Sequence, residues 1–107
     1  MLKLKMKADK EKWFDYDEDI AFLIRPFPLS ERAILPRINN IYELMYKEAE
    51  YCLVDWKGII DDDDKPVKCI DKNKAFLLNF CSDYVKFITD KSSELVESLS
   101  ESTSKKT

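Results

Sequence analysis

The sequence predicts an α+β domain in which an antiparallel β meander of about three strands precedes three to four α-helices. Apolar residues alternate with polar ones in the first quarter of the chain and recur every three or four residues later on. The single glycine, Gly58, stands between two helical stretches. Since 45% of the 107 residues are hydrophobic, we expect one α+β domain over residues 1–97. Residues 98–107 are rich in Ser and Lys, which predicts a flexible tail.

Three strands are predicted in the N-terminal segment. Residues 2–6 alternate leucine or methionine with lysine, the two-residue period of a half-buried strand. Residues 12–16 and 20–24 form two further candidate strands, and the acidic residues 17–19 between them predict a turn. Pro26 ends the third strand, because proline cannot donate a ladder hydrogen bond. A three-stranded meander is the simplest arrangement.

Helical signals follow the predicted strands. Ser30 is a good N-cap for a short helix that Pro36 limits. Apolar residues then recur at three- and four-residue steps from about 37 to 54, which predicts an amphipathic helix. Further on, Asp71 is the predicted cap of a third helix and Ser82 of a fourth, unless these two form one bent helix.

A short hairpin is predicted around residues 54–70, with an acidic turn at its tip. Asp61 would occupy the first position of an EF-hand loop, but Pro66 stands at the sixth, where glycine is required. Lys72 stands at the twelfth position, where glutamate is required. We therefore interpret the four consecutive aspartates as an exposed polar turn and expect no metal site.

No catalytic or cofactor-binding constellation is visible. The chain lacks histidine, which removes Ser-His and Cys-His nucleophilic pairs and the commonest zinc ligand. A single glycine cannot build a P-loop or a Rossmann turn. The acidic residues between 15 and 19 crowd a predicted turn, so we interpret them as a solvated hairpin tip. We expect a protein that is not an enzyme, with no catalytic residues, no cofactor and no small-molecule substrate.

Compartment signals point to the cytoplasm. The start of the chain alternates and contains no apolar run of the kind found in export signals. No stretch approaches the ~20 apolar residues of a membrane helix, so no membrane partner is expected. Cys52, Cys69 and Cys81 form no Cys-x-x-Cys pair, and we expect reduced thiols in the core.

The charge distribution argues against nucleic acid as a partner. The net charge is −3 and the isoelectric point about 5.0, whereas nucleic-acid binding favours a basic surface. The N-terminal lysines are interrupted by Asp9 and Glu11, which indicates a solvated strand face. A small nucleic-acid-binding regulator is kept as an alternative on the strength of those lysines alone.

Two segments carry a family resemblance. The first, residues 13–31, ends a strand in Ile-Arg-Pro and begins a helix with Leu-Ser-Glu. The second, residues 53–78, runs from Trp56 and the glycine through the acidic turn to Pro-Val and a further helix. This order resembles small tail assembly chaperones and related tail-region proteins of long-tailed bacteriophages and prophages. The chain departs from the pattern at Asp64, where glycine is expected, and Asp tolerates the left-handed conformation better than most residues.

The resemblance implies a non-catalytic function in the cytoplasm of a bacterial host. Such proteins bind the tape-measure protein, keep it soluble and help to polymerise the tail tube around it. The expected partners are therefore the tape-measure and tail tube proteins, with a homo-oligomer left open. The alternative in the same setting is a structural adaptor retained in the virion, such as a head–tail joining or tail-completion protein. The candidate partner-binding residues are Tyr42, Tyr46, Trp56, Phe87, Ile88 and Leu95.

Overall fold

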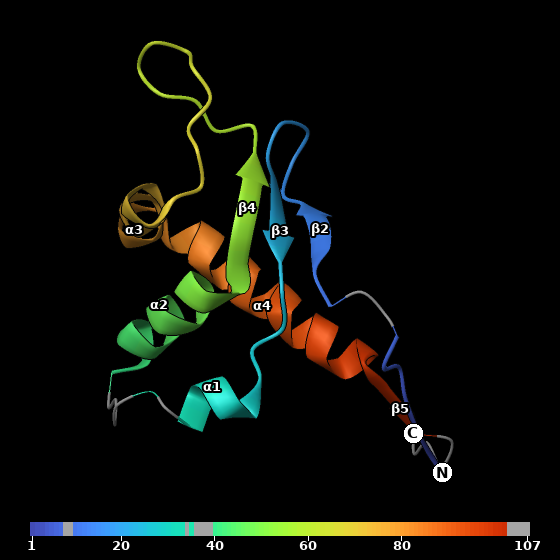
Figure 1. Cartoon of the computed structure of the whole chain (residues 1–107). Coiled ribbons are helices and arrows are strands. Elements are labelled where there is room, and N and C mark those ends of the chain that lie inside the picture. Colours follow the sequence, from blue (N-terminus) through green and yellow to red (C-terminus); the bar gives the residue numbers. More distant parts are fainter. Residues whose placement is uncertain (8–9, 34, 36–39, 103–107) are drawn as a thin grey trace.

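The computed structural model describes residues 1–7, 10–33, 35 and 40–102, with the side chains of 101 and 102 left out (Figure 1). Its elements confirm the predicted α+β class, with a three-stranded antiparallel sheet packed against helices. No helix in these ranges is long and apolar enough to cross a membrane. The elements are β1 (Leu2–Leu4), β2 (Lys12–Asp15), β3 (Ala21–Ile24), α1 (Leu29–Ala33), α2 (Ile41–Cys52), β4 (Leu53–Lys57), α3 (Asp71–Phe80), α4 (Ser82–Ser98) and β5 (Ser100–Ser102).

The sheet has the order β2-β3-β4, which corrects one part of the predicted meander. The strand at Leu2–Leu4 forms, but it pairs with β5 and takes no part in this sheet. β4, which directly follows α2, occupies the third place beside β3. The physical reason is burial, because Leu53 and Trp56 of β4 are at most 6% exposed, whereas Leu2 and Leu4 are about 60% exposed.

The core lies between the sheet and the helices. Figure 1 shows α4 crossing behind β4 and the end of β3, with α2 and α3 beside it. Phe22 and Ile24 of the central strand are completely buried. The buried apolar residues are Phe22, Ile24, Ala49, Cys52, Leu53, Trp56, Leu77, Leu78, Val85, Ile88 and Leu95.

The helix ends follow local backbone chemistry. Asn40 begins α2, and its side-chain oxygen accepts hydrogen bonds from the backbone N–H groups of Tyr42 (2.8 Å) and Glu43 (3.4 Å). The predicted start at residue 37 lies outside the described residues. α3 and α4 are separate helices, because Cys81 leaves the helical conformation (φ −125°, ψ 78°). Asp71 and Ser82 are the first residues of their helices, so the two predicted caps are wrong by one position.

The hairpin predicted around residues 54–70 is present in part. Beyond β4, Ile60 and Pro66 form an isolated antiparallel bridge, and the Asp61 carboxylate at the tip accepts hydrogen bonds from two backbone N–H groups. Asp64 has a positive φ of 61°, a left-handed conformation that glycine adopts most readily. The aspartates thus form a polar turn, as predicted.

Asp64→Gly is expected to raise the free energy of unfolding by about 0.5 kcal/mol. The substitution relieves a left-handed conformation that costs an L-residue roughly 1–2 kcal/mol, partly offset by the greater freedom of glycine in the unfolded chain. Urea unfolding measures the difference. Asp63→Gly removes the same charge at a residue without a positive φ, so it should lower stability instead. Equal effects of the two substitutions would contradict this account.

Both ends of the described chain meet in a two-stranded ribbon. β1 pairs with β5 in antiparallel register, with Leu2 opposite Ser102 and Leu4 opposite Ser100. Ser98 ends α4, so residues 98–102 lie in or beside regular structure, where the sequence predicted a flexible tail. Residues 103–107 lie outside the described residues. In Figure 1 the ribbon projects from the opposite side of the molecule to the two acidic turns.

Candidate interaction groove

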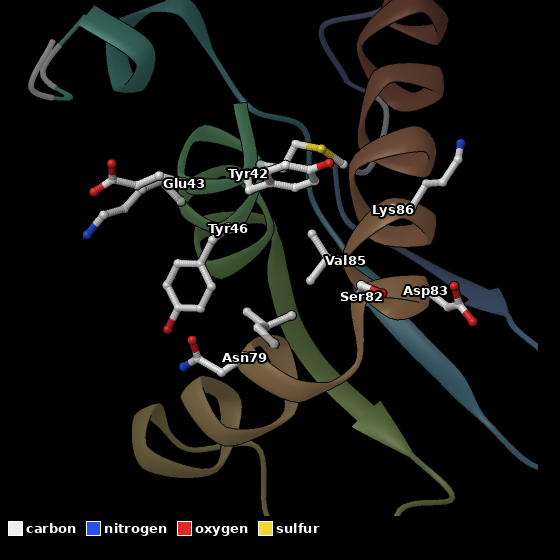
Figure 2. Close-up of a pocket in the computed structure, with 11 residues that line it drawn as sticks. Tyr42, Glu43, Tyr46, Asn79, Ser82, Asp83, Val85 and Lys86 are labelled. Carbon is white, nitrogen blue, oxygen red and sulfur yellow. The ribbon is translucent and has the colours of Figure 1, made fainter. Parts of the chain in front are cut away.

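A groove of about 790 Å³ lies between α2 and the junction of α3 with α4 (Figure 2). Met45, Leu78 and Val85 supply its apolar floor. These three residues come together because the break at Cys81 lets α4 turn away from α3, so that the end of one helix and the start of the next face α2. The groove is therefore a product of the helix break.

Two tyrosines of α2 line one wall of the groove. Tyr42 and Tyr46 are one helical turn apart, and Tyr42 is 79% exposed whereas Tyr46 is half-buried. Figure 2 shows the Tyr46 hydroxyl directed towards Asn79 of α3. Partial burial and the Glu50 carboxylate raise the pKa of Tyr46, with the Asn79 side chain acting in the opposite direction. Its hydroxyl is therefore protonated at neutral pH and can donate a hydrogen bond.

The rim of the groove carries both signs of charge. Glu43 and Asp83 contribute carboxylates, and Lys47 and Lys86 contribute ammonium groups. The Lys86 ammonium lies 3.0 Å from a carboxylate oxygen of Asp90, one turn further along α4, so part of this charge is already paired. Such a rim suits a partner surface of mixed charge rather than a polyanion.

An exposed aromatic pair stands on α3 beside the groove residue Asn79. Phe76 and Phe80 are 70% and 74% exposed, and their ring centroids are 5.0 Å apart. The sequence predicted a helix here but did not identify these two residues as exposed. Their one-turn spacing, set against the buried neighbours Leu77 and Leu78, is the signal that could have identified them as surface residues. Large exposed apolar side chains of this kind mark interaction surfaces.

The predicted partner-binding residues divide into two groups. Tyr42 and Tyr46 line the groove, so their assignment as contacts stays a prediction. The other four pack inside the domain. Trp56 is 6% exposed, and its indole N–H donates to the Val67 carbonyl at 2.7 Å. On α4, Ile88 is completely buried, Leu95 is 6% exposed, and Phe87 joins the aromatic cluster of the core.

Burial keeps two of the cysteine thiols protonated. Burial raises the pKa of the Cys52 thiol to about 11, against the opposing effect of the Ser92 hydroxyl 3.2 Å away, and burial also raises the pKa of Cys69 to about 11. Both thiols are therefore protonated at neutral pH.

Asp17 accepts hydrogen bonds from the backbone N–H groups of Asp19 and Ile20, as a turn residue does. Within the described ranges, no three His, Cys, Asp or Glu side chains are grouped as metal ligands.

Comparison with known proteins does not assign the chain to a group. No protein-family model, curated protein or solved structure matches it. Function is therefore inferred from the groove and the residues that line it.

Proposed function

We propose that this protein is a non-catalytic tail assembly chaperone of a phage or prophage that acts in the bacterial cytoplasm. In this proposal the groove between α2 and the α3–α4 junction receives an amphipathic helix of the tape-measure protein. The groove is the observation that carries the proposal, since it combines an apolar floor with exposed aromatic side chains.

The chemistry of the groove fits helix-in-groove recognition. An amphipathic helix presents apolar side chains every three or four residues, and an apolar groove buries that face. Met45 supplies a flexible, polarisable surface that adapts to different side chains. Tyr42 offers a large ring with a polar tip, the kind of residue enriched at protein interfaces.

The exposed phenylalanines of α3 extend the apolar surface next to the groove. Phe76 and Phe80 lie on the helix that also supplies Leu78 and Asn79 to the groove. A bound helix longer than the groove would cover these rings and remove them from water. A tape-measure protein is long and helical, so it contains many helical segments of this kind.

The proposed assignment to a phage or prophage rests on the resemblance of residues 13–31 and 53–78 to tail-region proteins. The same resemblance covers a structural adaptor, which would stay in the finished particle. Mass spectrometry of purified virions separates the two functions, because a chaperone is absent from them and an adaptor is present.

Tyr42→Glu is expected to weaken binding to the tape-measure protein at least about tenfold, because a charge on the groove wall must be desolvated when an apolar helix binds. The tape-measure protein encoded in the same genome is co-expressed with the chain, and its soluble yield and co-purification are measured. Met6→Glu is the matched control, since Met6 is 78% exposed and lies outside this groove. Equal binding by both variants, or salt-sensitive DNA binding by the unaltered protein, would overturn the proposal.

A further inference from the structure

A second groove, of about 610 Å³, lies on a different part of the molecule. It is bordered by the segment that joins β3 to α1, by α2 and by the last turns of α4. Pro26, Phe27 and Leu29 line one side, and Val96 and Leu99 the other. This groove shares no lining residue with the first one.

Arg25 is held rigidly in this second groove. Its Nε donates to the Tyr51 carbonyl at 2.8 Å, and its guanidinium carbon lies 3.9 Å from the centroid of the Tyr51 ring. Tyr51 in turn packs edge-on against Phe27, with ring centroids 5.4 Å apart. A guanidinium fixed by stacking and by one hydrogen bond loses little conformational freedom when it binds a ligand.

In the part of the chain that the structure describes, no carboxylate lies within ion-pair distance of the Arg25 guanidinium. The neighbouring Arg32 differs, because its Nη2 lies 3.1 Å from Oε2 of Glu48. No acceptor among the described residues bonds the two terminal nitrogens of Arg25, which together carry four N–H donors. A half-buried cation in this state attracts an anion.

The geometry points to Arg25 as a carboxylate-binding residue for a glutamate or aspartate side chain of a partner peptide with apolar neighbours. The planar guanidinium matches a carboxylate through two parallel hydrogen bonds, which are stronger than neutral ones. The apolar walls at Phe27 and Val96 would cover the residues that flank the acidic side chain. Glu11 and Glu97 are exposed on the rim, where they favour lysines at the ends of such a peptide. This site is independent of the proposed tape-measure groove.

The test is an NMR titration of the ¹⁵N-labelled full chain with three peptides. The first is acetylated and amidated, with a glutamate between leucines and a lysine at each end. The second carries glutamine in place of glutamate, and the third carries glutamine and a free C-terminal carboxylate after a leucine. We expect saturable shifts of the Arg25 Nε–H signal and of the Val96 and Leu99 amides with the first peptide. The glutamine peptide should bind at least about tenfold more weakly, as expected for loss of a charge-assisted bidentate pair.

Arg25→Lys is expected to weaken binding of the glutamate peptide at least about tenfold, because lysine keeps the charge but loses the planar fork. Arg32→Lys is the matched control and should change the affinity less than about threefold, since Arg32 already has Glu48 as its partner. Equal binding of the glutamate and glutamine peptides overturns the proposal without reliance on any variant. Tighter binding of the peptide with the free C-terminus, or equal losses in the two arginine variants, also overturns it.

Discussion

Phe22→Ala is expected to lower the free energy of unfolding by about 3–5 kcal/mol, the range for removal of a buried phenylalanine side chain. Phe22 is completely buried in the central strand, and its ring centroid lies 5.3 Å from that of Tyr84 and 6.1 Å from that of Phe87. Its loss leaves a cavity between the sheet and α4. Chemical denaturation followed by circular dichroism measures the change.

Phe76→Ala provides the matched control for this experiment. Phe76 is 70% exposed, so its removal should change stability by less than about 0.5 kcal/mol. If Phe22→Ala fails to fold, Phe22→Leu gives a smaller change that can still be measured, expected near 1 kcal/mol. Similar losses at the two phenylalanines would contradict the placement of the core between the sheet and α4.

Gly58→Ala is expected to destabilise the protein by about 2–4 kcal/mol, the sum of left-handed strain and overpacking. Gly58 has a φ of +85°, and a Cβ atom built there would lie 1.9 Å from the backbone oxygen of Asp19. Backbone cannot move aside as a flexible side chain can, so the turn between β2 and β3 would have to shift away from the end of β4. Thermal and urea unfolding measure the loss.

Lys65→Ala serves as the control for Gly58→Ala, because Lys65 is exposed in the same hairpin and its side chain makes no described contact. Its effect should stay within about 0.5 kcal/mol. A Gly58→Ala protein as stable as the Lys65→Ala protein would show that the two hairpins do not touch as described.

The elements of this fold were predictable because their signals are local. The alternation in residues 12–24 and the three- and four-residue steps of α2 depend on neighbours in sequence. Strand pairing is not local in this way. β1 meets β5 near the other end of the chain, and an alternating pattern tells which face of a strand is apolar without telling which strand lies beside it. The strand at residues 2–6 was therefore predicted as part of this sheet, in a place that β4 occupies.

The candidate site was predictable only in part, for a related reason. Tyr42 and Tyr46 could be placed on one side of a helix from their spacing. Ile88 and Leu95 belong to an apolar stripe of the same kind, but α4 buries that stripe against the sheet and α2. A stripe that forms the core and a stripe that binds a partner have the same sequence pattern. Only the packing of the helices distinguishes them.

The β1–β5 ribbon places positive charge on the side of the molecule opposite the acidic turns (Figure 1). Lys3 of β1, together with Lys5 and Lys7 directly after it, concentrates positive charge at the ribbon. The acidic turns at residues 17–19 and 61–64 lie on the opposite side (Figure 1). The net charge of −3 thus includes a group of positive charges and two groups of negative charges that lie apart. At low ionic strength this separation of charge will orient the molecule in an electric field, and salt will screen the effect.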